Sequence, residues 1–237
     1  KNTTALSLAN PTPSQVATPS FSGSANSITI SGNYAYVGRT SQDGIAVVDI
    51  SDPTDPRTPV YESTTEDVLG IAIKDNYAYA AARGSGLAII DISDPTNPGT
   101  PIYMETDGLA FSVDLKSNYA FVANSSTGSS APGSKGLAVI DISNPTSPGN
   151  PIFRALNDHP EDIYIRGDYA YLAVTGAGLA IIDISNPTNP GTPTYKDTNG
   201  TARKIDILGD YAYVADGGSG LAIINISNPL NPGEPTY

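Results

Sequence analysis

The chain has 237 residues with 24 acidic and 12 basic side chains, a formal net charge of −12 and no cysteine. This charge excludes nucleic acid and anionic membrane surfaces as partners, because both need a cationic face. The sequence has no apolar run of 18 residues, so we predict no membrane insertion, and without cysteine no thiol nucleophile is available.

Residues 1–23 carry a shortened copy of a motif that recurs further along the chain. The segment Leu-Ser-Leu-Ala-Asn-Pro-Thr-Pro, residues 6–13, resembles the later Ile-Asp-Ile-Ser-Asn-Pro-Thr-Asn-Pro, and residues 18–21 resemble the later Thr-Pro-Thr-Tyr. The segment therefore reads as the second half of an additional repeat, with Leu6, Leu8, Val16 and Phe21 as its apolar strand residues.

From residue 24 onward one unit is repeated five times. The glycine that opens each Gly-Leu-Ala-Ile-Ile-Asp-like motif is Gly44, Gly86, Gly136, Gly178 or Gly220, and a Tyr-Ala-Tyr-like anchor runs in phase with it. A period near 42 residues without helical periodicity is typical of propeller blades. We predict an all-β fold, a five-bladed β-propeller over 24–237, with blades at about 24–64, 65–106, 107–156, 157–198 and 199–237.

Each unit is predicted to contain four strands, which in the fourth unit are 162–166, 169–174, 179–185 and 193–195. The third strand is almost continuously apolar, which indicates burial on both faces between neighbouring blades. The proline-rich stretch after it excludes helix and makes the fourth strand an edge strand.

The unit, written Leu-Ala-Ile-Ile-Asp-Ile-Ser-Asn-Pro in its fourth copy, resembles the LVIVD repeat of bacterial and archaeal surface or secreted proteins. The resemblance covers about residues 24–237 and implies a β-propeller in an extracellular or cell-surface location. It implies no shared substrate or reaction. A chain that starts at Lys1 fits a mature secreted form, and Asn225 departs from the aspartate of the repeat.

All five units contain their own fourth strand, so the strand in residues 1–23 is surplus and needs another sheet edge. Three placements are open: it closes its own ring by replacing residues 235–237, it pairs with another molecule, or it belongs to a longer array. Donation to a neighbouring subunit would give a head-to-tail contact that closes or propagates.

One aspartate per blade, Asp49, Asp91, Asp141 and Asp183, precedes the proline-rich turn. We interpret these carboxylates as acceptors for hydrogen bonds from the turn that follows. Calcium binding is the alternative, although the spacing is not that of an EF-hand loop. The sequence predicts no cofactor and no metal site otherwise.

Carboxylates also lie on or near the predicted inner strands: Asp67, Asp114, Glu161, Asp162 and Asp206. Five-bladed propellers include glycosidases with carboxylates there, and two at a suitable separation can act as acid and nucleophile. Solvation or cation binding is the favoured interpretation. The single histidine, His159, lies in a loop, and no nucleophile elbow or phosphate loop is present. We therefore predict no enzyme.

The repeats differ most in the loops of one face, where the candidate binding residues are Arg39, Arg83, His159, Arg203 and Asp216. They indicate a glycan-binding or adhesive module as one alternative. Candidate N-glycosylation sites are Asn2, Asn124 and Asn199, of which Asn124 opens the insertion of the third unit and is expected to be exposed.

The sequence thus predicts a non-enzymatic, extracellular structural or interaction propeller. Its expected partner is a second copy, with self-assembly into a filament or surface array by donation of the N-terminal strand. The alternatives are a glycan-binding or adhesive module and, behind it, a propeller glycosidase.

Overall fold

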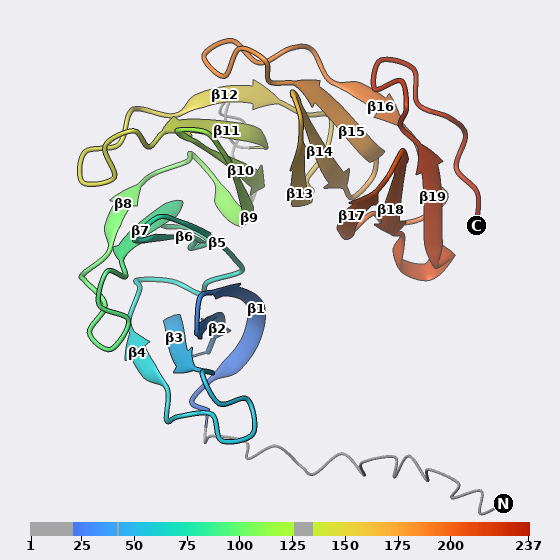
Figure 1. Cartoon of the computed structure of the whole chain (residues 1–237). Coiled ribbons are helices and arrows are strands. Elements are labelled where there is room, and N and C mark those ends of the chain that lie inside the picture. Colours follow the sequence, from blue (N-terminus) through green and yellow to red (C-terminus); the bar gives the residue numbers. More distant parts are fainter. Residues whose placement is uncertain (1–20, 42, 126–134) are drawn as a thin grey trace, which may run out of the picture.

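The computed structural model describes residues 21–41, 43–125 and 135–237, and almost all regular structure in them is β (Figure 1). Leu6, Leu8 and Val16 lie outside the described residues. The strands of the first two units are β1 (Ser24–Ser31), β2 (Tyr34–Thr40), β3 (Gly44–Asp49), β4 (Val60–Glu62), β5 (Gly70–Lys74), β6 (Tyr77–Ala81), β7 (Leu87–Asp91) and β8 (Ile102–Met104).

The remaining strands are β9 (Leu109–Lys116), β10 (Tyr119–Ser125), β11 (Gly136–Asp141), β12 (Ile152–Ala155), β13 (Pro160–Arg166), β14 (Tyr169–Val174), β15 (Gly178–Asp183), β16 (Thr194–Lys196), β17 (Lys204–Leu208), β18 (Tyr211–Ala215) and β19 (Leu221–Asn225). A 3-10 turn, η1 (Gly217–Ser219), precedes β19. No helix of the described residues is long and apolar enough to cross a membrane.

Each unit forms one antiparallel sheet in which consecutive strands are neighbours. We call these sheets blades 1 to 5: β1–β4, β5–β8, β9–β12, β13–β16 and β17–β19. In blade 5 the place of the fourth strand is taken by a single bridge between Ile223 and Thr236. The predicted all-β fold of five propeller-type repeats is confirmed.

The short links inside each blade follow from turn chemistry. The first hairpin of blade 4 turns at Gly167, which has a positive φ of 56°, and the corresponding residue of blade 5 is Gly209 at 55°. Only glycine adopts this region without steric cost. Each two-residue turn therefore fixes the register of the first two strands.

The hydrophobic core is divided into four parts, one between each pair of consecutive blades. We call the blade surface that packs on the following blade its forward face and the opposite surface its backward face. Between blades 4 and 5, for example, the forward face of blade 4 presents Tyr171, Leu179 and Ile181, and the backward face of blade 5 presents Ala212 and Ile224. The other three cores use the corresponding residues. Alanine on the backward face allows the sheets to approach closely.

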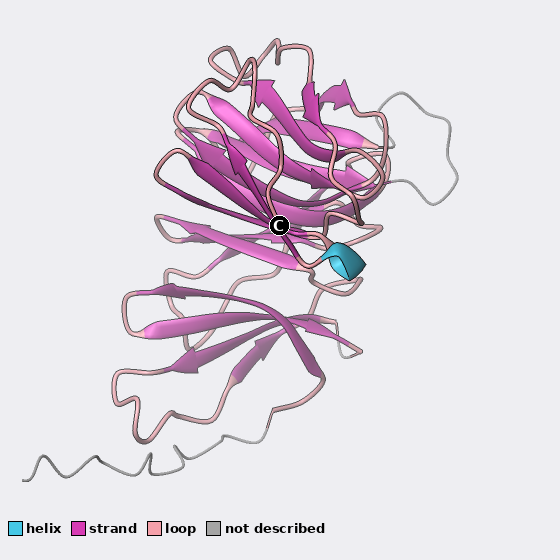
Figure 2. Ribbon diagram, turned by 90° about the vertical axis from the view of Figure 1, so that its right-hand side faces the viewer, coloured by secondary structure: helices cyan, strands magenta, loops and turns pink. Residues whose placement is uncertain are grey.

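The five blades form an open arc (Figure 1). Figure 2, a view from the side, shows the sheets stacked one after another. Blade 1 and blade 5 lie on the two sides of a wide gap, so the five described blades do not make the closed ring that a five-bladed propeller implies.

Candidate functional site

The inner strands of all five blades line one hollow at the axis of the arc. Its volume is about 280 Å³, and one residue from each blade contributes to it: Asn26, Leu69, Phe111, Glu161 and Arg203, with Lys204 beside the last. We call this hollow the axial pocket. It lies at the lower end of the size range of small-molecule sites.

A backbone irregularity places these side chains. In blades 1, 3 and 4 the residue in question is the extra residue of a β-bulge, between Ala25 and Ser27, between Ala110 and Ser112, and between Pro160 and Asp162. In blades 2 and 5 the amide of Leu69 or Arg203 bonds to the second strand at the same place. A bulge redirects one side chain away from the alternation of the strand, here toward the axis.

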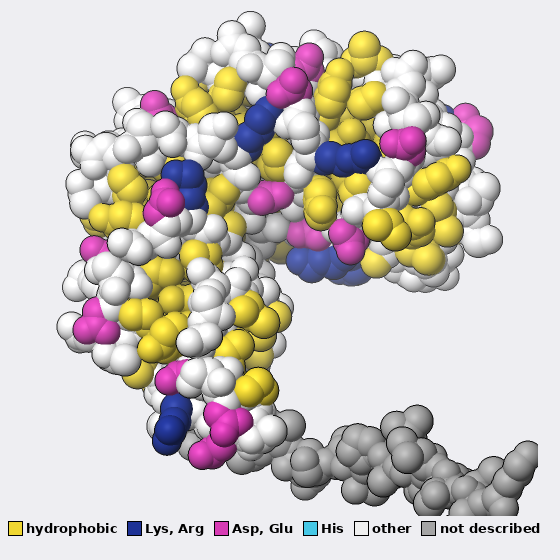
Figure 3. All heavy atoms as spheres, in the orientation of Figure 1, with side chains coloured by type: hydrophobic (Ala, Val, Ile, Leu, Met, Phe, Trp, Pro, Cys, Tyr) yellow, Lys and Arg dark blue, Asp and Glu magenta, His cyan; other side chains and the backbone are white. Residues whose placement is uncertain are grey.

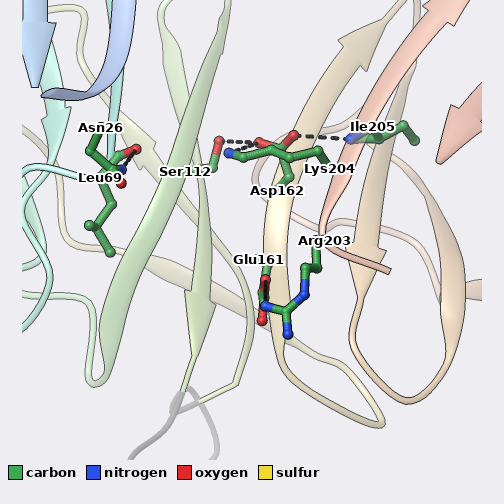
Figure 4. A network of polar contacts seen from close by, with 8 residues as sticks. All are labelled: Asn26, Leu69, Ser112, Glu161, Asp162, Arg203, Lys204 and Ile205. Carbon is green, nitrogen blue, oxygen red and sulfur yellow. Dashed lines mark hydrogen bonds and ion pairs between the residues drawn. The ribbon is translucent and has the colours of Figure 1, made fainter. Parts of the chain in front are cut away.

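Two ion pairs lie at the pocket (Figure 4). Arg203 contacts Glu161 at 3.3 Å and Lys204 contacts Asp162 at 3.4 Å. The Asp162 side chain is only 13% exposed. It also accepts hydrogen bonds from the Ser112 hydroxyl at 2.8 Å and from the Ile205 amide at 3.1 Å. Asp162 therefore joins blades 3, 4 and 5.

Asp114 has a similar connecting role one step further along its strand. Its carboxylate accepts the amide of Ile165 in the next blade and that of Leu115 in its own, both at 2.7 Å. Burial raises the pKa of Asp114, and these two hydrogen bonds partly oppose the shift. Asp206 accepts the amide of Ile207, and Asp67 accepts that of Ser41 and pairs with Arg83. The inner-strand acids are thus engaged with backbone amides or cations.

The aspartates before the proline-rich turns are also acceptors. Asp49, Asp91, Asp141 and Asp183 each take the amide of the serine two residues later at 2.8 Å. These bonds lower the pKa of each carboxyl group. Asn225 makes the same bond to Ser227 at 2.9 Å, so the departure from aspartate keeps the turn. Among the described residues no group of three or more acidic or histidine side chains could hold a metal ion.

The candidate residues of the loop face are held by local partners. Arg39 is 3% exposed, donates to the carbonyls of Ser22 and Asp43, and lies over the Tyr61 ring at 4.5 Å. Asp216 is fully buried and accepts the Thr198 hydroxyl at 2.6 Å. His159 contacts the hydroxyl of Ser125 through Nδ1 at 2.7 Å. Of the five, only Arg203 lines the axial pocket.

The sequons have different surroundings. The expectation of an exposed Asn124 is wrong: its side chain is fully buried at the end of β10 and exchanges hydrogen bonds with Thr106. A glycan cannot be accommodated there in this fold. Asn199 is exposed, with its backbone amide bonded to the Tyr237 hydroxyl, while Asn2 lies outside the described residues.

Sequence reasoning did not identify the axial pocket, although it named two of its members. The available signal was the column of the repeat alignment at the start of the first strand, where the five units carry an amide, an aliphatic, an aromatic, an acidic and a basic side chain.

Comparison with known proteins supports the fold. A model of the LVIVD repeat matches residues 22–58, 67–104, 107–150, 159–195 and 199–236. No sequence among curated proteins matches the chain significantly.

Several solved structures resemble it. The computationally designed Ika8 protein gives a TM-score of 0.64 at 10% identity, over 90% of this chain and 60% of Ika8. A functionally unknown protein from Desulfotomaculum acetoxidans gives 0.66 at 16% identity, over 92% and 69% of the two chains. The β-propeller domain of Cps50 (Swd1) from Myceliophteria thermophila gives 0.63 at 12% identity, over 91% and 70%. The chain thus spans between 60% and 70% of the length of these structures.

Proposed function

The chain belongs to the LVIVD-repeat family, and on that premise we propose that it is a non-enzymatic, extracellular structural propeller that associates head-to-tail with copies of itself through the end faces of its arc. The observation that carries the proposal concerns the interface that occurs four times inside the chain: blade 5 exposes its forward face, and blade 1 exposes the inner strand of its backward face. The engagement of the inner-strand acids as connections between blades supports a role without catalysis.

The forward face of blade 5 is apolar and exposed. Leu221 is 48% exposed, whereas the corresponding Leu87, Leu137 and Leu179 are fully buried against the following blade. Figure 3 shows hydrophobic side chains gathered at this end of the molecule. An exposed contiguous apolar surface of this kind marks an interaction site.

The backward face of blade 1 is exposed along its inner strand. Ile28 and Ile30 are 66% and 63% exposed, whereas the corresponding Ile205 and Ile207 of blade 5 are 8% and 9% exposed against blade 4. The other residues of this face, Ala35, Val37, Ala46 and Val48, are only 0–7% exposed. The open part of the backward face is therefore its inner strand, and the forward face of another copy would pack against that strand.

Charge at the rim of the two end faces is compatible with this contact. Inside the arc, Lys116 pairs with Asp168 at 2.6 Å and Arg166 with Asp210 at 3.5 Å, in each case across a blade interface. At the forward end, blade 5 has Leu208 at the position of Lys116 and Arg166. At the backward end, blade 1 has Asn33 at the position of Asp168 and Asp210. The contact between copies would bury no unpaired charge at this point.

A contact between two different faces is heterologous, and it grows unless the rotation closes. Propellers typically have 4–8 blades, and the chain already supplies five, so two copies contain roughly two blades more than one flat ring holds. Association is therefore expected to leave the plane of the ring and to continue as an open assembly. Donation of the strand in residues 1–21 is a further element of the proposal.

Two complementary variants test the head-to-tail contact. Leu221→Glu spoils the forward face and Ile28→Glu the backward face, since burying an unpaired carboxylate is costly. In sedimentation velocity we expect the native chain to associate with rising concentration, each variant alone to stay monomeric, and an equal mixture of the two to form a dimer that grows no further.

Leu230→Glu is the matched control. Leu230 is 68% exposed, but the threonines at its position in blades 1 to 4 are exposed as well, so it lies outside the interface. A native chain that stays monomeric, or a mixture that gives no dimer, would overturn the proposal. If a chain lacking residues 1–21 still associates, the end faces suffice; if it does not, the donated strand is required.

A further inference from the structure

The axial pocket brings together side chains that the repeat does not need. The strands themselves are nearly uniform: the position after the first tyrosine is alanine in all five blades, at residues 35, 78, 120, 170 and 212. At the bulge position that faces the pocket, by contrast, no two blades share a residue. This difference does not follow from blade packing and points to a separate role for the pocket.

The position occupied by Asn124, Val174 and Asp216 also differs between blades. Packing explains the differences at that position, whereas it does not explain those at the pocket. At that position Asn124 meets Thr106 and Asp216 meets Thr198, so each polar side chain faces a polar partner. In blade 4 the corresponding pair is Val174 and Leu156, both apolar and both buried. Compensation of this kind accounts for variety in a core. Arg203 and Asn26 are exposed to the pocket instead.

Three charged side chains line the pocket, Glu161, Arg203 and Lys204, and the two cations are the more exposed ones. The side chains of Arg203 and Lys204 are 59% and 64% exposed, whereas their partners Glu161 and Asp162 are 24% and 13% exposed. An arginine that keeps most of its donors accessible suits a planar carboxylate. Arg203 and Lys204 are neighbours in the chain and are each more exposed than the carboxylate they pair with, which favours an anion at this place.

The opposite part of the pocket is apolar. Leu69 and Phe111 are half-buried and line it from blades 2 and 3, and Asn26 donates to the Leu69 carbonyl from blade 1 (Figure 4). An apolar wall with a few directed polar groups is the usual composition of a ligand site. The two parts together select a molecule with an anionic end and an apolar body.

We propose that the axial pocket binds a small organic carboxylate with an aromatic or apolar body, its carboxylate at Arg203 and Lys204 and its body against Leu69 and Phe111. This site is distinct from the end faces, so the test of ligand binding does not depend on whether the chain self-associates.

The test uses phenylacetate as the probe and phenylacetamide, which lacks the charge, as its matched ligand. Calorimetric titration of the full chain is expected to show saturable binding of phenylacetate, with phenylacetamide weaker by about tenfold or more. Arg203→Met should weaken phenylacetate binding by a similar factor and leave the weak binding of the amide unchanged. Phe111→Ala should weaken both ligands.

Lys74→Met is the control variant. It removes one positive charge from an inner strand, where Lys74 pairs with Asp75 and does not line the pocket, and it should leave binding unchanged. Thermal unfolding of each variant separates loss of the fold from loss of the site, and Phe111→Leu should retain binding if Phe111→Ala fails to fold. Equal binding by Arg203→Met, equal loss with Lys74→Met, or no saturation with phenylacetate up to about 10 mM would overturn the proposal.

Discussion

The aspartate that ends the third strand in blades 1 to 4 forms a hydrogen bond with the turn after it. Its carboxylate oxygen accepts a hydrogen bond from a backbone N–H of the turn, which would otherwise be bonded to water. The side-chain oxygen of Asn225 accepts the same bond in blade 5.

We expect Asp141→Ala to lower the free energy of unfolding by about 1 kcal/mol and Asp141→Asn to lower it by less, because alanine loses the acceptor for Ser143 whereas asparagine loses only the charge. Urea unfolding of the two variants measures the difference. Equal losses in both would mean that the charge rather than the hydrogen bond matters.

A tyrosine on the fourth strand fastens the blade to the segment that enters it. The hydroxyls of Tyr61, Tyr103, Tyr195 and Tyr237 accept the amides of Ser22, Thr65, Asn157 and Asn199 at 2.6 to 3.1 Å. Blade 3 has Phe153 at this position and lacks the bond.

Phe153→Tyr is therefore expected to raise the free energy of unfolding by about 0.5–1 kcal/mol, with the amide of Asp107 as the new donor. Tyr195→Phe is the reverse change and should cost a similar amount. Thermal unfolding of both variants provides the check, and a Phe153→Tyr chain that melts lower than the native one would contradict the assignment.

The carboxyl groups fall into two classes with opposite effects of pH. Asp91, Asp141 and Asp183 have lowered pKa values, so they stabilise the folded chain above their unfolded pKa and this stabilisation fades as the pH falls through the folded value. The pKa of Asp114 is raised by burial, so its contribution is present below its unfolded pKa and is lost as the pH rises through the folded value.

Carboxyl NMR titration should accordingly show Asp114 losing its proton at higher pH than the three turn aspartates. A midpoint for Asp114 at or below theirs would disprove the assignment.

At the scale of the strand, the glycine that starts the third strand is required by two separate constraints. Gly178 has a φ of +71°, and a Cβ there would lie 2.5 Å from the carbonyl oxygen of Lys196 in the fourth strand. Gly220 of blade 5 has a similar φ of +85° but nothing within 4 Å of the same position.

Gly178→Ala should therefore destabilise the chain by more than Gly220→Ala, for which only the backbone conformation costs about 1–2 kcal/mol. Chemical unfolding of the two variants gives the difference in their free energies of unfolding, which measures the steric clash of the Cβ at Gly178. If Gly220→Ala proves as costly as Gly178→Ala, the segment around Thr236 lies closer to Gly220 than the structure shows.

The strands themselves could be predicted, because the Tyr-Ala-Tyr and Leu-Ala-Ile-Ile-Asp anchors fix their order and pairing. The bulge near the start of the first strand could not be predicted, since one extra residue changes which side chain faces the axis without changing the apolar pattern. Asn124 was misjudged for a related reason: β10 runs one residue beyond it, to Ser125, and draws its side chain into the core.

At the scale of the whole molecule, each blade is stabilised by its neighbours, so position in the arc matters more than sequence. The first four residues of Leu-Ala-Ile-Ile-Asp in β7 are buried, whereas in the nearly identical Leu-Ala-Ile-Ile-Asn of β19 the first and last residues are exposed and the middle one is half-buried. The open ends could not be predicted from the sequence, because the same letters occur in both environments and the rotation between blades is not encoded in the repeat length.

Hydrogen exchange should reflect this gradient. We expect the amides of β18 and β19 to exchange faster than those of β10, β11 and β14, because local opening of an end blade breaks one interface and opening of a central blade breaks two. Mass spectrometry after deuterium labelling resolves the difference at low protein concentration, where end faces are free. Uniform protection of all five blades would indicate that the arc unfolds as one unit.

The open arc also bears on how such a chain changes over generations. Its repeats are close to interchangeable, and each contacts only its neighbours, so unequal crossing-over within the gene would delete or duplicate a 42-residue unit and recreate contacts that already exist. A closed ring accommodates one number of blades, and an additional blade would disrupt its closure. An open arc imposes no such count, so the number of blades can change while the contacts between consecutive blades are retained.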